Sequence, residues 1–195
     1  MNLPNKLTIS RFVLTVAFMG VIISEAPFHQ TLALALFVAA SLTDYFDGMI
    51  ARRDKLVTNF GILMDPLVDK ILVCSAFITF VGLKLIPAWV AVIIVARELA
   101  ITGLRLLAAS KQVVLPAENW GKAKTILQIV AIIAMLVTIS YEQWGAWAKA
   151  VFEFRIFGPW VVWFTEVSKW VAVLLTFYSG VVYLWRNRQL YLHDL

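Results

Sequence analysis

Four aspartates in two pairs are the residues of this sequence whose types and spacing could do chemistry. Asp44 and Asp47 lie three residues apart, and Asp65 and Asp69 lie four apart. Residues at either spacing share one face of an α-helix, so each pair would present two carboxylates in one direction. Both pairs lie in long apolar stretches, where a charged aspartate costs about 2.5–3.5 kcal/mol on membrane-insertion scales. The carboxylates therefore need a partner that compensates for their charge.

A divalent cation is the partner that best fits these carboxylates. Converging carboxylates without cations repel one another and become protonated. All-oxygen anionic ligation suits Mg²⁺ or Mn²⁺, whereas the single cysteine, Cys74, and only two histidines argue against zinc. Two metal ions about 4 Å apart would be able to share the four ligands and polarise a substrate diphosphate. We therefore predict a site for two Mg²⁺ or Mn²⁺ ions between two antiparallel helices.

Three small residues accompany the aspartates on the same helical faces. Gly48 and Ala51 lie within one turn of Asp47, and Gly61 lies one turn before Asp65. Small side chains would let a nucleotide approach the backbone, but they equally favour close packing between membrane helices. The spacing leaves both interpretations open.

The stretch from Asp44 to Asp69 resembles the signature of the CDP-alcohol phosphotransferase family. It fits D-x2-D-G-x2-A-R-x8-G-x3-D-x3-D at all eight fixed positions. Further motifs within residues 1–139 are similar to bacterial phosphatidylglycerophosphate synthases, whereas residues 140–195 resemble nothing specific. The resemblance implies an enzyme that transfers a phosphatidyl group from CDP-diacylglycerol to glycerol 3-phosphate and releases CMP. It also implies a homodimer, although no GxxxG motif marks an interface in the apolar stretches.

The resemblance also implies roles for individual residues. Asp69 would be the general base and a metal ligand, together with Asp44, Asp47 and Asp65. The residues expected to contact the CDP-lipid are Asn5, Thr8, Gly48, Ala51, Arg52, Thr58 and Gly61. Arg52 also has a simpler explanation, because basic residues commonly end a membrane helix on its cytoplasmic side.

Four cations are candidates for binding the acceptor phosphate: Arg97, Arg105, Lys122 and Lys124. Arg97 carries most weight, because a charge near the middle of an apolar stretch needs a partner or a substrate. An ion pair with Glu98 or with the aspartates is its alternative role, and the two lysines would alternatively only set topology. Arg105 follows Arg97 by eight residues, so both could line one cavity. Four cations favour a phosphorylated acceptor over inositol, serine or choline, with inositol phosphate as the alternative to glycerol 3-phosphate.

Hydropathy places these residues on membrane helices. The sequence is 62% apolar and only 15% charged, and its mean hydropathy is +0.84. Six stretches are long enough to cross roughly 30 Å of hydrocarbon. They are residues 7–24, 31–52, 61–83, 87–108, 123–140 and 167–185. We therefore predict an all-α integral membrane protein in which a short N-terminal juxtamembrane segment precedes six transmembrane helices, in a single domain over residues 1–195.

Basic residues predict the orientation of these helices. The lysines and arginines of residues 6–11, 52–55, 111–124 and 186–188 fall on one side if the chain alternates across the membrane. Both termini and the active site would then face the cytoplasm, in the inner membrane of a bacterium. Residues 143–163 contain four tryptophans, which suit either a short helix in the outer interface or a plain aromatic belt.

The net charge of +5 is distributed among several connections rather than along one stripe. This distribution disfavours nucleic acid and favours membrane lipid and anionic substrates as partners. A cation transporter is a more distant alternative for the buried aspartates. Transport would require ionisable groups through both halves of the membrane, but the outer halves of the second and third stretches are apolar.

Overall fold

The computed structural model describes residues 3–54, 59–113, 119–154 and 158–192. Within these ranges, the side chains of some residues near the helix ends are not described. These are residues 3–5, 7, 44–54, 59–63, 65–66, 69, 119–122, 154, 158 and 192.

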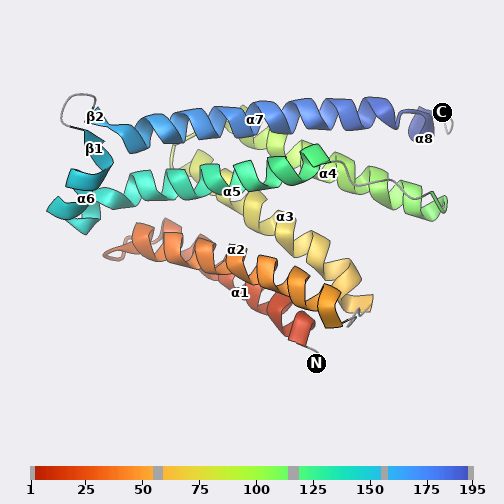
Figure 1. The fold of residues 1–195 in the computed structure, drawn as a ribbon, viewed down its shortest axis with the longest axis horizontal. Helices are drawn as coiled ribbons and strands as arrows, with labels where there is room; N and C mark the ends of the chain where they lie inside the picture. The colour runs from red at the N-terminus through yellow and green to blue at the C-terminus, as the bar shows by residue number, and fades with distance from the viewer. Residues whose placement is uncertain (1–2, 55–58, 114–118, 155–157, 193–195) are drawn as a thin grey trace.

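Six long helices make up most of the described chain (Figure 1). They are α1 (Leu3–Ile23), α2 (His29–Asp54), α3 (Asn59–Gly82), α4 (Ala88–Ser110), α5 (Asn119–Ser140) and α7 (Trp160–Arg186). The predicted all-α architecture is confirmed, and each predicted apolar stretch lies on one of these helices. The largest difference is at α7, which begins at Trp160 rather than at residue 167.

The helix boundaries fall at residues that interrupt helical geometry. Pro87, with φ −72° and ψ 148°, precedes α4, and Pro159, with φ −72° and ψ 102°, precedes α7. Proline is tolerated at a helix start because the first N–H groups of a helix have no intrahelical partner. Lys84 takes a left-handed conformation, with φ 58°, in the turn between α3 and α4.

One large apolar core joins the six long helices, and a smaller cluster of Ile101, Leu104 and Tyr183 lies between α4 and α7. The buried side chains of the large core come from all six helices and include Phe18, Phe37, Phe77, Ile94, Ile132 and Val173. The rings of Phe18 and Phe37 lie 5.7 Å apart and hold α1 against α2. Large apolar side chains also cover the outside of the bundle, among them Leu99 and Leu174. An apolar exterior around an apolar core is typical of a helix bundle in lipid.

Two helices are long and apolar enough, by length and composition, to cross a membrane. They are Ala123–Trp144 and Trp160–Arg186, with mean hydropathies of 2.0 and 1.5. Shorter apolar helices cover Thr8–Ile23, His29–Thr43 and Lys70–Gly82. This test applies only to the residues whose side chains are described, so six membrane crossings stay a prediction.

The segment before α7 is more irregular than a single interfacial helix. A 3₁₀ turn, η1 (Tyr141–Trp144), leads into α6 (Ala146–Phe152), followed by a short antiparallel pair of β1 (Glu153–Phe154) and β2 (Gly158–Pro159). Gly145, with φ 85°, separates η1 from α6 in a conformation that favours glycine. Within residues 143–163, α6 is the short helix of this segment, seven residues long, and residues 160–163 already belong to α7.

Aromatic side chains tie this segment to the bundle. The ring of Trp144 stacks on Trp147 with centroids 6.0 Å apart, and Phe152 packs against Trp160 at 5.8 Å. The indole of Trp144 donates a hydrogen bond of 2.8 Å to the hydroxyl of Thr31 on α2. Aromatic rings with satisfied polar ends are typical of a membrane interface.

The basic residues gather at one end of the bundle. The beginning of α1 and the short helix α8 (Gln189–Leu192) lie at the same end in Figure 1. The last turns of α4 and α7 lie at this end too, and α6 lies at the opposite end (Figure 1). Lys6 is in the first turn of α1, Lys111 directly follows α4 and Arg186 ends α7, whereas Lys149 is on α6. This distribution is the one expected if both termini face the cytoplasm, and the orientation stays a prediction.

Candidate active site

The four predicted metal ligands lie on two helices that are consecutive in the chain and in contact with each other. Asp44 and Asp47 lie on α2, and Asp65 and Asp69 lie on α3. Both helices are continuous through these positions, so each pair keeps its shared helical face.

The side chains of several predicted site residues lie outside the described part of the structure. They include all four aspartates and also Asn5, Gly48, Ala51, Arg52, Gly61 and Lys122. Thr58 lies outside the described residues altogether. Their roles stay predictions.

Among the residues predicted to contact the CDP-lipid, Thr8 has a side chain whose surroundings the structure describes. It is buried on α1, on the face that also buries Arg11 and Thr15. The hydroxyl of Thr15 donates a hydrogen bond of 2.8 Å to the backbone carbonyl of Arg11. Because α1 packs against both α2 and α3, Thr8 lies inside the bundle on the side of the aspartate helices.

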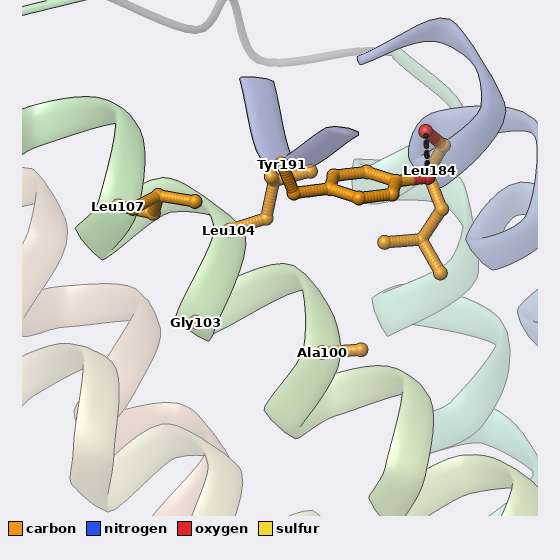
Figure 2. A pocket seen from close by; sticks show the side chains of 6 residues that line it. All are labelled: Ala100, Gly103, Leu104, Leu107, Leu184 and Tyr191. Carbon is orange, nitrogen blue, oxygen red and sulfur yellow. Dashed lines mark hydrogen bonds between the residues drawn. The ribbon is translucent and has the colours of Figure 1, made fainter. Parts of the chain in front are cut away.

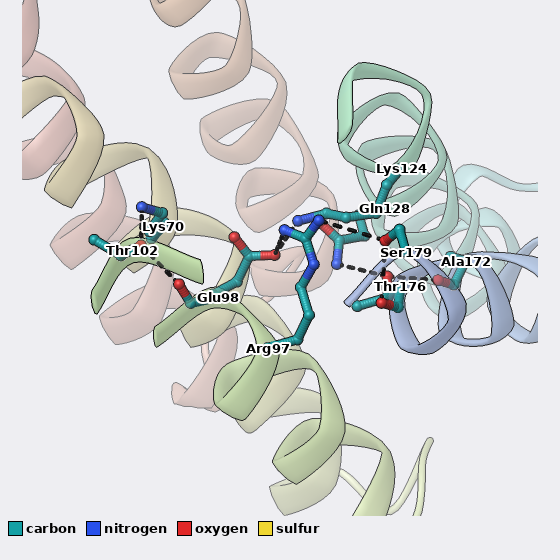
Figure 3. Close-up of polar contacts among 9 residues, drawn as sticks. All are labelled: Lys70, Arg97, Glu98, Thr102, Lys124, Gln128, Ala172, Thr176 and Ser179. Carbon is teal, nitrogen blue, oxygen red and sulfur yellow. Dashed lines mark hydrogen bonds and ion pairs between the residues drawn. The ribbon is translucent and has the colours of Figure 1, made fainter. Parts of the chain in front are cut away.

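Glu98 on α4 is the centre of a buried ion cluster (Figure 3). Its Oε1 atom lies 3.4 Å from Nη1 of Arg97 and also accepts a hydrogen bond from Nζ of Lys124 on α5. At most 12% of each of these side chains is exposed. Since two cations share one carboxylate, the cluster of these three residues carries a net positive charge.

Helix α7 supplies polar partners to the same cluster. Nη2 of Arg97 lies 3.4 Å from the hydroxyl of Ser179, to which it donates. One turn away, Nε2 of Gln128 on α5 donates a hydrogen bond of 3.0 Å to the hydroxyl of Thr176. These contacts fix α4 and α5 against α7 with polar groups rather than with apolar packing alone.

A second contact links the cluster to the aspartate helices. Lys70, the residue after Asp69 on α3, donates a hydrogen bond to the hydroxyl of Thr102 on α4. Thr102 in turn donates to the backbone carbonyl of Glu98 at 2.7 Å. The last residues of the aspartate motif therefore lie against the helix that carries Arg97 and Glu98.

Arg105 does not join Glu98 but lies along the same side of α7. Its Nε is 3.5 Å from the hydroxyl of Tyr183, and its guanidinium lies 5.8 Å from the centre of that ring. Ser179 and Tyr183 are four residues apart on α7, so Arg97 and Arg105 meet one face of this helix. The structure thus brings Arg97 and Lys124 together at Glu98 and places Arg105 farther along the same face of α7.

An apolar groove near Arg105 does not suit a phosphate. It encloses about 350 Å³ between α4, α7 and α8 (Figure 2). Its lining residues are Ala100, Gly103, Leu104, Leu107, Leu184 and Tyr191. The polar end of Tyr191 already donates to the carbonyl of Leu184 at 3.2 Å. Binding of an anion is therefore better explained by the ion cluster than by this groove.

A metal site is compatible with the residue types on α2 and α3. Four carboxylates on two helices in contact form the all-oxygen donor set that Mg²⁺ and Mn²⁺ prefer. Among the residues whose side chains are described, no group of three or more His, Cys, Asp or Glu side chains could hold a metal. The four aspartates stay the predicted metal ligands.

Sequence reasoning missed the polar residues of α5 and α7 that surround the cluster. Glu98 was expected only as an alternative partner of Arg97, and that ion pair is present. The sequence analysis predicted no role for Gln128, Thr176 or Ser179. A polar residue within an apolar helix is the signal that would have indicated them.

Comparison with known proteins decides the family. The family model of the CDP-alcohol phosphatidyltransferases matches residues 1–178. The chain belongs to this family. The match extends well beyond residue 139, so residues 140–178 also belong to the family fold, although they resembled nothing specific.

Relatives within the CDP-alcohol phosphatidyltransferase family match this chain over nearly its whole length. The CDP-diacylglycerol--glycerol-3-phosphate 3-phosphatidyltransferase of Bacillus subtilis is 40% identical over 95% of both chains. The protein of the same name from Rickettsia bellii is 33% identical over 93% of both. A probable phosphatidylglycerophosphate synthase of Mycobacterium tuberculosis is 40% identical over 71% of this chain and 68% of its own.

Replacing Glu98 tests the stability of the ion cluster. We expect Glu98→Gln to lower the free energy of unfolding by about 3 kcal/mol, because it leaves two buried cations without a carboxylate. Titration with SDS in mixed micelles would measure the loss. The matched control is Glu166→Gln, whose partner Lys169 lies 2.6 Å away but whose own side chain is half exposed. There we expect a smaller loss, because only one cation loses its carboxylate and Lys169 keeps its contact with the Trp170 ring at 5.6 Å, and equal losses in the two variants would contradict the structural role of Glu98.

Proposed function

We propose that this protein transfers the phosphatidyl group of CDP-diacylglycerol to glycerol 3-phosphate, giving phosphatidylglycerophosphate and CMP. The names of the relatives support this reaction, and two of them match more than nine-tenths of the chain. The observation in the structure that carries the acceptor assignment is the cluster of Arg97 and Lys124 around Glu98.

The cluster suits an anionic acceptor for an electrostatic reason. Two buried cations that share one carboxylate retain an excess of positive charge, which a phosphate group would neutralise. Arg97 offers a planar fork of N–H donors and Lys124 a compact ammonium, a combination that suits phosphate oxygens. Lys122 and Arg105 would add positive charge along the path to this site.

Asp69 is the general base of the proposed reaction. Its carboxylate takes the proton from the primary hydroxyl of glycerol 3-phosphate, and the hydroxyl oxygen attacks the phosphorus of the phosphatidyl group. A new oxygen–phosphorus bond forms while the bond to the CMP oxygen breaks, so CMP leaves. The contact between Lys70 and Thr102 supports this assignment, because it holds the end of the aspartate motif against the acceptor cluster. Positioning and charge neutralisation would supply most of the rate enhancement.

Asp44, Asp47, Asp65 and Asp69 would hold two Mg²⁺ or Mn²⁺ ions. Bound there, the ions would neutralise the diphosphate of the CDP-lipid and stabilise the leaving oxygen. The nucleotide itself would lie against Gly48, Ala51, Arg52 and Gly61, with Thr58, Thr8 and Asn5 nearby.

We also propose that the six long helices all cross the bacterial cytoplasmic membrane. The gathering of basic residues at the end that holds α8 supports a cytoplasmic location for both termini and the active site. A homodimer remains the family expectation.

The choice of acceptor can be measured as CMP release from CDP-diacylglycerol in detergent micelles with Mg²⁺. We expect rapid release with glycerol 3-phosphate. Release with glycerol should be lower by on the order of 100-fold or more, because glycerol leaves the buried cations unpaired. Mass spectrometry would identify the lipid product. Reaction with inositol phosphate but not with glycerol 3-phosphate would overturn the assigned acceptor and leave the chemistry intact.

The roles of the aspartates can be separated by metal titration. We expect Asp69→Asn to lower kcat by about 100-fold to 10,000-fold at any metal concentration, because it removes the base. Asp44→Asn should lose activity that additional Mg²⁺ partly restores. A chelator should abolish turnover of the unaltered enzyme, and Glu166→Gln serves as a control carboxylate. Near-normal turnover by folded Asp69→Asn would show that another group is the base.

The orientation can be tested by labelling single cysteines in a Cys74→Ala background. All four candidate positions are exposed: Lys6 and Lys111 at the predicted cytoplasmic end, and Lys84 and Lys149 at the other. A membrane-impermeant maleimide should label Lys84→Cys and Lys149→Cys in intact spheroplasts. Lys6→Cys and Lys111→Cys should react only after permeabilisation, and the reverse pattern would show the opposite orientation.

A further inference from the structure

Gly180 on α7 makes the space that the side chain of Arg97 occupies. A Cβ atom added at Gly180 would lie 2.7 Å from Cγ of Arg97, 3.7 Å from its Cβ and 3.9 Å from its Cδ. The shortest of these distances is far below van der Waals contact. Since Cγ is close to the backbone, Arg97 could not avoid the clash without changing χ1 or moving α4 away from α7.

Among the glycines whose surroundings the structure describes, this relation is specific to Gly180. A Cβ atom added at Gly20, Gly82 or Gly103 would meet nothing within 4 Å. Glycine in the interior of a helix is destabilising relative to alanine, so a buried glycine in α7 needs a reason. Close passage of Arg97 provides one.

The neighbouring contacts fix the other end of the same side chain. The two terminal nitrogens of Arg97 lie 3.4 Å from Glu98 and 3.4 Å from Ser179 (Figure 3). The aliphatic part of the Arg97 side chain is therefore confined by Gly180, and its guanidinium is confined by two polar partners. Its guanidinium is held on the side of the cluster that faces Lys124, with which it shares Glu98.

We infer that Gly180 is a positioning residue for the acceptor: the absence of a side chain there sets where the Arg97 guanidinium stands and thereby sets the affinity for the acceptor phosphate. The inference rests on the proposed function, because it takes glycerol 3-phosphate as the ligand of Arg97. It assigns a role to α7, which lies far from the aspartate motif in the chain.

The direct test is the KM for glycerol 3-phosphate in Gly180→Ala. We expect it to rise about tenfold, because a displaced guanidinium binds the phosphate in the wrong geometry. The KM for CDP-diacylglycerol should stay unchanged, and kcat should change by less than about twofold if chemistry itself is intact. Gly20→Ala is the matched control, because it makes the same change in an open position of α1.

A double-mutant cycle with Arg97→Ala separates positioning from general damage. In the Arg97→Ala background the colliding Cγ is gone, so Gly180→Ala should change the acceptor kcat/KM by less than about twofold. The initial slope at low glycerol 3-phosphate gives this quantity even when turnover is slow. An equal loss in both backgrounds would overturn the inference, because the effect would then be independent of Arg97.

The remaining outcomes are also decisive. If the unaltered protein does not use glycerol 3-phosphate, the proposed function fails. If it does, and Gly180→Ala has the same acceptor KM as Gly20→Ala, only the role of Gly180 fails. Should Gly180→Ala not fold, the double variant with Arg97→Ala must fold, because it lacks the clash; failure of the double variant as well would overturn the inference.

Discussion

The sharing of one buried carboxylate by two cations is the constraint on which the packing of α4, α5 and α7 depends. A lone buried charge is costly, and a charge pair in the interior is stable only when hydrogen bonds satisfy its remaining donors. Glu98 therefore requires Lys124 to approach from α5 and Arg97 to turn toward α7. This arrangement explains the polar residues of α5 and α7. It also explains why position 180 is a glycine.

The bundle places the predicted metal ligands and the proposed acceptor-binding cations on two different groups of helices. The acidic residues of the family signature lie on α2 and α3, whereas the cations of the proposed acceptor site lie on α4 and α5 and are supported by α7. In the proposed phosphatidyl transfer, the aspartates would hold the metal ions that bind the diphosphate, and the cations would bind the acceptor phosphate. The Lys70–Thr102 contact crosses from one group to the other.

How much could be predicted from the sequence depended on whether the residues were close in the chain. The aspartate motif spans consecutive helices, so its spacing indicated both a shared face and a family. Arg97 was identifiable because it interrupts an apolar stretch. Its partner Ser179 is 82 residues away in the chain, so the sequence did not indicate this contact. A glycine such as Gly180 has no side chain whose chemistry could indicate a role. The early start of α7 was missed because an aromatic segment resembles a belt as much as a helix. The eight residue steps from Arg97 to Arg105 turn the helix by about 80° beyond two full turns, so the two need not share one partner.

The carboxylate in the cluster also bears on selectivity for the acceptor. Without Glu98, Arg97 and Lys124 would be two buried cations facing each other before any substrate binds, which would favour an open, hydrated site. With Glu98 present, the cations stay close and ordered, but one positive charge is still unmatched among these three residues. A neutral alcohol cannot provide the missing negative charge, whereas a phosphate can. In the proposed acceptor site, an internal carboxylate that only partly neutralises its partners would therefore preserve both the fold of the site and a preference for an anion.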